Sequence, residues 1–171
     1  RVYTLGATGI VNALDAATGR LAWSRDAAAD TGAKLPGWGF AGSPLAVDGL
    51  VIVAASGRLA GYDAATGTPR WTRTTRGGGY SSPHLMTVDG VTQVVLLHGG
   101  GASAVAPRDG AVLWEHDWPG DVAIVQPARA SDRDILVTVA DPMGGSGLRR
   151  VSLDHGAAGW TTGRPISRRS P

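Results

Sequence analysis

Short apolar runs alternate with glycine-containing turns along the whole chain. Residues 50–55 form a continuous run rich in valine and isoleucine, which predicts a strand buried on both faces. The dipeptides Asp48-Gly49 and Ser56-Gly57 on either side of it are typical two-residue hairpin turns. This stretch therefore predicts four antiparallel strands, which are expected at 43–47, 50–55, 58–62 and around Trp71.

The same order of strands and turns returns further along the chain. The next unit has its turn at Asp89-Gly90 and its apolar strand at 94–97, and the last unit has its apolar strand at 135–139. The first unit lacks the opening strand. Four strands every ~45 residues, in antiparallel meanders, indicate the blades of a β-propeller.

The sequence thus predicts an all-β fold, a partial β-propeller with about four blades of four-stranded antiparallel meanders. The propeller is expected to span residues 1–163, and residues 164–171 are expected to form an irregular basic tail. The expected blades lie approximately at 1–26, 42–76, 80–118 and 124–163.

A tryptophan follows a glycine by four residues once in each unit. The pairs are Gly19/Trp23, Gly67/Trp71, Gly110/Trp114 and Gly156/Trp160, and successive tryptophans are 48, 43 and 46 residues apart. Glycine at a tight turn takes a positive φ that strains other residues. A tryptophan buries a large apolar area against a neighbour. We therefore expect each indole to lie against the adjacent blade and to hold successive blades together.

Two of these copies resemble a known repeat motif. Residues 13–23 read Ala-Leu-Asp-Ala-Ala-Thr-Gly-Arg-Leu-Ala-Trp, and residues 61–71 read Gly-Tyr-Asp-Ala-Ala-Thr-Gly-Thr-Pro-Arg-Trp. Both are similar to the tryptophan-docking motif Ala-x-Asp-x-x-Thr-Gly-x-x-x-Trp of pyrroloquinoline-quinone (PQQ)-like repeat propellers. The third copy keeps only Ala104 and its glycine and tryptophan, and the fourth keeps only the last two.

This resemblance implies both an architecture and a choice of functions. The superfamily includes quinoprotein dehydrogenases and a periplasmic lipoprotein of the outer-membrane protein assembly machinery. Its rings usually hold seven or eight blades, so the chain resembles a fragment, about half of one ring. The resemblance implies export to the bacterial periplasm or beyond. Two functions stay open: a non-catalytic scaffold that binds a protein or a small ligand, and a portion of a PQQ-dependent dehydrogenase.

The residues that quinone chemistry requires are scarce in this sequence. By the resemblance, a quinoprotein needs acidic and amide ligands for calcium and an aspartate base, and its alcohol dehydrogenases also use adjacent cysteines. The chain has no cysteine, one glutamate (Glu115) and one asparagine (Asn12). Its four histidines lie in different repeats without the spacing of metal ligands. We therefore expect no catalytic residue and no metal site here, and PQQ with calcium only if the full-length protein is a quinoprotein.

Aromatic and polar residues gather just before the predicted opening strands. In propellers that strand lines the central channel, so these segments are expected at a channel mouth. Aromatic rings, hydroxyls and an amide at such a place can stack on a small ligand and hydrogen-bond it. The alternative is that Trp38 and Tyr80 fill the channel. The candidate ligand-binding residues are Trp38, Ser43, Tyr80, Ser81, Ser82 and Gln126.

Charge and hydropathy restrict the possible partners. The net charge is +2, but three arginines lie in the last eight residues, and the remaining 13 basic groups nearly balance 14 acidic ones. No basic stripe is available for nucleic acid, and no apolar run approaches the roughly 20 residues of a membrane span. The last unit has apolar residues and no evident polar cap, so we expect two copies to pair into a closed ring, or the chain to aggregate. These apolar residues are Leu136, Val137, Val139, Val151 and Leu153.

Overall fold

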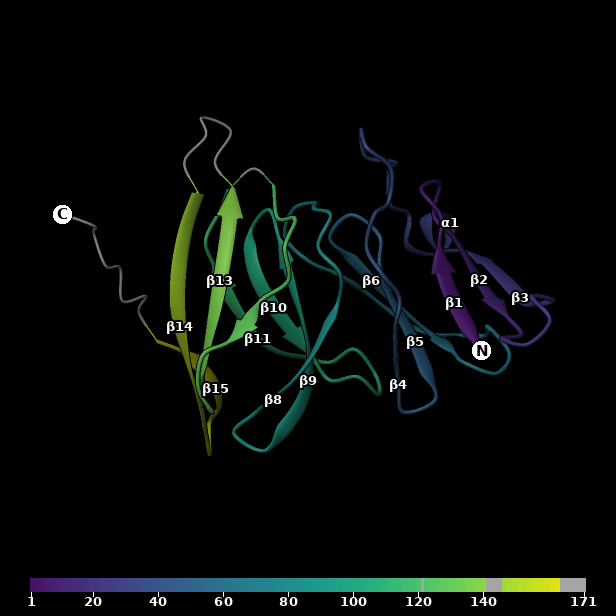
Figure 1. The fold of residues 1–171 in the computed structure, drawn as a ribbon. Coiled ribbons are helices and arrows are strands. Elements are labelled where there is room, and N and C mark those ends of the chain that lie inside the picture. The colour runs from purple at the N-terminus through teal and green to yellow at the C-terminus, as the bar shows by residue number, and fades with distance from the viewer. Residues whose placement is uncertain (121, 141–145, 164–171) are drawn as a thin grey trace.

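Four antiparallel sheets stand side by side in an open row (Figure 1). The computed structural model describes residues 1–120, 122–140 and 146–163. We name the sheets blades 1 to 4 in chain order. The predicted all-β, partial-propeller fold is confirmed, and the predicted tail at 164–171 lies outside the described residues.

The strands follow one another along the chain, blade by blade. Blade 1 contains β1 (Val2–Leu5), β2 (Ile10–Leu14) and β3 (Leu21–Asp26), and blade 2 contains β4 (Leu45–Val47), β5 (Leu50–Ala54), β6 (Arg58–Asp63) and β7 (Pro69–Thr74). Blade 3 contains β8 (His84–Val88), β9 (Val91–His98), β10 (Gly101–Val105) and β11 (Val112–Asp117), and blade 4 contains β12 (Ala128–Arg129), β13 (Asp134–Ala140), β14 (Ser146–Gly156) and β15 (Gly159–Thr162).

Each sheet is a meander in which consecutive strands pair. Blades 2 to 4 have four strands, and blade 1 has the three that its sequence predicts. A short helix, α1 (Ala27–Thr31), was not predicted; it follows β3. The Asp26 carboxylate caps it by accepting the Ala29 amide, and Gly32 ends it with a φ of 66°. The helix therefore lies in the long connection between blades 1 and 2.

An aspartate organises the turn before the last strand in blades 1 and 2. The Asp63 carboxylate accepts the backbone N–H groups of Ala65 at 3.0 Å and Thr66 at 2.9 Å. Arg70 donates to the same carboxylate at 2.9 Å, and these bonds lower the pKa of Asp63 to about 2. Asp15 holds the equivalent turn of blade 1 in the same way, through Thr18.

The hydrophobic cores lie between the blades rather than within them. Because side chains of a strand alternate between the two faces of its sheet, each blade contributes one face to each neighbouring core. Val11 and Val53 lie in the core between blades 1 and 2, and Ile52 and Leu96 in the core between blades 2 and 3. The core between blades 3 and 4 contains Met86, Val88, Val95, Leu97, Ala102, Ala104, Trp114, Ile135, Val137, Val151 and Leu153.

Trp23 joins blade 1 to blade 2. Its indole is 8% exposed and lies in the core between the two blades. The indole N–H donates to the Ala64 carbonyl of the next blade at 3.1 Å. A Cβ atom placed on Gly67 would come within 2.7 Å of the indole. Gly67 therefore has two constraints, a φ of 75° and the close approach of this ring.

Trp71 makes the same set of contacts between blades 2 and 3. Its indole N–H donates to the Pro107 carbonyl at 3.1 Å, and a Cβ atom on Gly110 would lie 2.6 Å from the ring. Gly110 also has a positive φ, of 69°. The indole of one blade thus packs on the turn glycine of the next blade, and its N–H bonds the carbonyl of a residue in that turn.

Trp114 faces blade 4 but has a different polar partner. It is buried in the core between blades 3 and 4. Its indole N–H donates to the side-chain oxygen of Gln93 at 2.6 Å, within its own blade. No described atom lies within 4 Å of a Cβ placed on Gly156. The contact with a turn glycine of the next blade is therefore missing here.

The pair Gly156/Trp160 departs from the predicted geometry. Gly156 ends strand β14 and pairs with Gly159 across a tight turn. Its φ is not positive, unlike that of the other three motif glycines. Trp160 pairs with His155, and their rings stack 4.4 Å apart. Trp160 also packs against the core between blades 3 and 4. Its indole therefore points back toward blade 3, whereas the other three point forward.

The outer face of blade 4 is more polar than the sequence analysis assumed. Val137, Val151 and Leu153 face blade 3, while the side chain of Val139 lies outside the described set. Strand register places Leu136 on the outer face, together with Asp134, Thr138, Leu148, Arg150, Ser152, Asp154 and Thr161. The expectation of an uncapped apolar end is therefore wrong.

Asp134 is the centre of this outer face. Its side chain accepts hydrogen bonds from Arg150 at 2.6 Å and from the hydroxyls of Ser152 at 2.6 Å and Ser131 at 2.5 Å. The Arg150 bond is the main cause of a pKa of Asp134 that is far below the usual value. Asp134 is only 8% exposed, so its charge is stabilised by these donors rather than by water.

Candidate functional site

Three loops that precede opening strands lie side by side. The backbone N–H of Ser43 donates to the Ser82 hydroxyl at 2.8 Å. The N–H groups of Tyr80 and Ser81 donate to the Ala123 carbonyl at 2.7 and 3.1 Å. We name the loops at 37–43, 77–82 and 123–126 the inner loops. Hydrogen bonds thus join loops from three consecutive blades.

The inner loops present large apolar side chains to solvent. Trp38 is 75% exposed, and its ring lies 5.2 Å from that of Tyr80, with the ring planes 36° apart. Ile124 and Val125 are each about half exposed. We name these four residues the exposed strip. The Trp38 indole is therefore available for contact with another molecule.

The other predicted binding residues have unequal positions. Ser81 is buried, and its hydroxyl donates to the Val125 carbonyl at 2.8 Å. Ser82 is half-buried, and its hydroxyl accepts the Ser43 amide. Ser43 and Gln126 are exposed. The serine hydroxyls at 81 and 82 thus connect the inner loops to one another, and Gln126 remains open to solvent.

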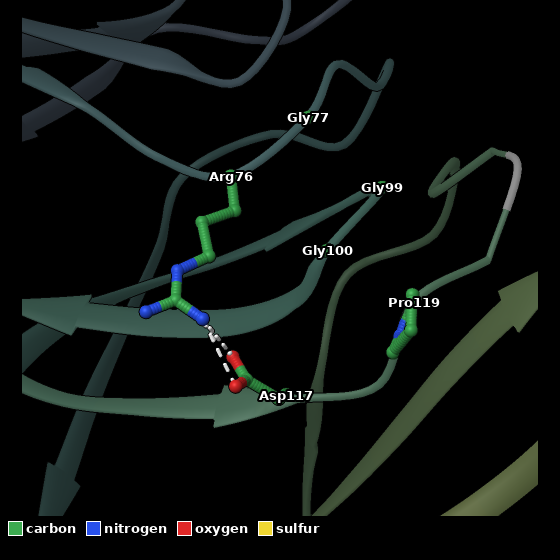
Figure 2. A pocket seen from close by; sticks show the side chains of 6 residues that line it. All are labelled: Arg76, Gly77, Gly99, Gly100, Asp117 and Pro119. Atoms are coloured by element: carbon green, nitrogen blue, oxygen red, sulfur yellow. Dashed lines mark hydrogen bonds and ion pairs between the residues drawn. The ribbon is translucent and has the colours of Figure 1, made fainter.

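A shallow pocket of about 370 Å³ lies between the end of β7, the β9–β10 turn and the end of β11, next to the start of the inner loop at 77–82 (Figure 2). It is lined by Arg76, Gly77, Gly99, Gly100, Asp117 and Pro119. The guanidinium of Arg76 donates to both carboxylate oxygens of Asp117 at 2.9 Å. Glu115 lies 3.7 Å away and adds a second negative charge. The acidic neighbours therefore balance the one cation that lines the pocket.

A buried serine–histidine pair lies beside this pocket. His98 Nδ1 is 2.6 Å from the Arg76 carbonyl, and Nε2 is 2.7 Å from the Ser103 hydroxyl. A carbonyl only accepts, so Nδ1 carries the proton and Nε2 accepts from the serine. Burial is the main cause of the lowered pKa of His98, which keeps the ring neutral. Both side chains are 2% exposed.

The Ser103–His98 hydrogen bond is like that of an activated serine nucleophile, but both side chains are buried, so a substrate cannot reach the serine hydroxyl. Ser103 does not line the pocket. The bond from His98 to Arg76 instead connects blade 3 to the end of blade 2. The sequence does not reveal this contact, because His98 and Ser103 continue strands that are otherwise apolar and no motif marks them.

The described residues do not offer the ligands that PQQ and calcium need. The inner loops carry hydroxyls, one amide and aromatic rings, but no carboxylate. Among the described residues, no three His, Asp or Glu side chains gather as a metal site. Hard cations such as calcium take six to eight oxygen ligands, usually including carboxylates. The residues present therefore do not fit this cofactor and its metal.

Three solved structures have folds similar to that of this chain. BamB from Moraxella catarrhalis superposes with a TM-score of 0.58 at 18% identity, over 88% of this chain and 45% of its own. The quinohemoprotein alcohol dehydrogenase ADHIIG from Pseudomonas putida HK5 gives 0.57 at 22% identity, over 89% and 27%. A quinohemoprotein alcohol dehydrogenase from Comamonas testosteroni gives 0.52 at 18% identity, over 88% and 30%. The chain thus spans less than half of each of these proteins.

A comparison with protein families identifies the family of this chain, whereas a comparison with individual curated proteins gave no match. Among the described residues, no helix has the length and hydrophobicity needed to cross a bilayer. Residues 1–142, most of the chain, match the family described as outer membrane protein assembly factor BamB. The chain therefore belongs to this family of PQQ-like repeat β-propellers.

Proposed function

We propose that this chain is a rigid, non-catalytic scaffold that binds a protein partner through the exposed strip. The observation that carries the proposal is the position of Trp38, whose indole is 75% exposed and packs against the Tyr80 ring at a tilt of 36°. Hydrogen bonds from neighbouring blades fix the loops that present it. A rigid, exposed aromatic anchor of this kind is typical of the central residues of protein interfaces.

Family membership supports this proposal and a location. The matching family is described as an outer membrane protein assembly factor, and BamB of Moraxella catarrhalis is similar in fold. We infer that this chain works in the bacterial periplasm, near the outer membrane or beyond it.

The second candidate is a portion of a PQQ-dependent quinoprotein dehydrogenase. Its support is the likeness in fold to two quinohemoprotein alcohol dehydrogenases. A titration of the purified protein, as its gene encodes it, with PQQ and calcium separates the two candidates. A saturable change in the absorption spectrum of the quinone would support the dehydrogenase. An unchanged spectrum is the result expected for the scaffold.

Site-specific photo-cross-linking tests the scaffold itself. A photoreactive amino acid at position 38 or 125 is expected to capture one partner in the native host, with the product identified by mass spectrometry. Position 112 is the matched control, because Val112 is also about half exposed but lies on β11 in blade 3, outside the inner loops. Equal products from all three positions, or none from position 38, would contradict a partner at the exposed strip.

A further inference from the structure

A third surface lies between the end of α1 and blade 2; it shares Gly77 with the Arg76–Asp117 pocket but, unlike that pocket, has no acidic residue in its lining. It is a pocket of about 300 Å³ between the end of α1, the β5–β6 turn and the end of β7. The residues that line it include two cations, three hydroxyls and four glycines, and no acid. They are Gly32, Lys34, Ser56, Gly57, Arg58, Thr74, Thr75, Gly77 and Gly78.

The positive charge of this pocket has no carboxylate to balance it. Within the described part of the chain, neither Lys34 nor Arg58 forms an ion pair. One nitrogen of the Arg58 guanidinium donates to the Thr31 carbonyl at 2.8 Å, which fixes the side chain. A guanidinium has five N–H donors, so several remain for a ligand. The nearby Asp30 carboxylate is already engaged by Arg25 and Tyr62.

Hydroxyl groups add neutral donors beside the two cations. Thr74 is the cross-strand partner of Arg58, so their side chains lie on the same face of blade 2. Ser56 lies in the β5–β6 turn next to Arg58 and lines the same pocket. The Thr75 hydroxyl is excluded from this role, because it donates to the Gly57 carbonyl. Two hydroxyls therefore remain beside the cations.

Glycine makes the wall of the pocket tight. A Cβ atom on Gly57 would collide with the Gly77 carbonyl, and one on Gly78 would lie 2.9 Å from the Ser56 hydroxyl oxygen. The backbones of the β5–β6 turn and of residues 77–78 thus pack directly on each other. Thr75 donates to the same Gly57 carbonyl from its backbone at 2.9 Å, which further fixes this wall.

We propose that this pocket binds a phosphate group, free or carried by a larger molecule. Two cations and two hydroxyl donors without an opposing acid match the charge and the several acceptor oxygens of a tetrahedral oxyanion. The pocket shares Gly77 and Gly78 with the inner loop that carries Tyr80, but none of its lining residues belongs to the exposed strip.

Titration with inorganic phosphate tests the proposal, with chloride at equal ionic strength as the reference. Phosphate is expected to raise the melting temperature of the protein saturably. Lys34→Ala and Ser56→Gly should each weaken binding; the lysine change should do so about 10-fold, as for one charge-assisted hydrogen bond. Glycine at position 56 suits the positive φ of 49° there. Arg20→Ala is the matched control, since it removes one exposed charge outside the pocket and should leave binding unchanged.

Lys34 also provides a direct readout, because it is the only lysine of the chain. Bound phosphate should slow acylation of its amine, measured by mass spectrometry, and should not slow acylation of the terminal amine. Glycerol 3-phosphate in place of inorganic phosphate shows which source is preferred: tighter binding of the ester favours a carried phosphate. Equal phosphate effects on Lys34→Ala and the unchanged protein, or no protection of Lys34, would overturn the proposal.

Discussion

Replacing Trp23 with alanine tests whether an indole between two blades holds them together. The side chain is buried in the blade 1–blade 2 core, and its N–H bonds Ala64 of the next blade. A buried tryptophan removes about 150–250 Å² from water, which corresponds to roughly 4–6 kcal/mol at 25 cal/mol per Å². The hydrogen bond adds about 1 kcal/mol.

Area estimates of this kind are upper bounds, because the unfolded chain already buries part of its surface. Large-to-small changes at buried tryptophans cost about 3–5 kcal/mol. We expect Trp23→Ala to lower the free energy of unfolding by about 3–5 kcal/mol. Trp23→Phe keeps most of the ring but loses the bond to Ala64, so it should cost about 1–2 kcal/mol.

Urea unfolding followed by circular dichroism measures these changes without relying on tryptophan fluorescence, which the substitutions themselves alter. Trp38→Ala is the matched control, since its indole is exposed and its loss should change stability by less than about 0.5 kcal/mol. Equal losses for Trp23→Ala and Trp38→Ala would refute the reasoning, because burial between blades would then have no effect on stability.

Three further substitutions test the geometry of the fold. Gly110→Ala should cost about 2–3 kcal/mol in the same unfolding assay, from its positive φ and its contact with Trp71, whereas Gly19→Ala, with no atom within 4 Å, should cost about 1–2 kcal/mol. Folding lowers the pKa of Asp63 from 3.8 to about 2, so the stability that its charged carboxylate adds to the fold is fully present above pH 3.8 and is lost as the pH falls toward 2. Asp63→Asn should reduce this pH-dependent loss of stability, measured as urea midpoints across that range. Arg150→Leu should make the outer face of blade 4 more apolar and increase association in light scattering relative to the unchanged protein.

The strands and turns could be predicted because each has a local cause. Asp63 and its glycine fix a turn through bonds within a few residues, and the apolar run of β5 is buried whatever surrounds it. The face that a side chain occupies has no such local cause. Strand register decides it, and a shift of one residue moves every side chain to the other face.

Trp160 shows this limit clearly. Its spacing of four residues from Gly156 equals that of the other pairs, yet the connection between the strands differs. In blade 1, Leu14 pairs with Leu21 across a six-residue turn, whereas in blade 4 Gly156 pairs with Gly159. The shorter turn changes which positions face the neighbouring blade. A count of residues between a glycine and a tryptophan could not reveal it.

The candidate surfaces differ in how far the sequence points to them. Trp38 and Tyr80 stand out in the sequence because they precede predicted opening strands, and the structure places their rings 5.2 Å apart. The sequence does not reveal the pocket proposed to bind phosphate, because Lys34 and Arg58 are ordinary surface residues there. They meet only because α1 places residue 34 beside the β5–β6 turn. Such sites arise from packing between blades and carry no motif.

The two ends of the row of blades are unlike, and this changes the expected mode of self-association. The outer face of blade 1 includes the half-exposed apolar side chains of Val2 and Leu21. The outer face of blade 4 carries the Asp134–Arg150 ion pair. A ring closed from two copies would press one face on the other and bury this pair against apolar groups, which is costly because the charges lose water. For a protein of these 171 residues alone, pairing of two copies through blade 1 avoids that cost, so we expect an isologous dimer rather than a closed ring.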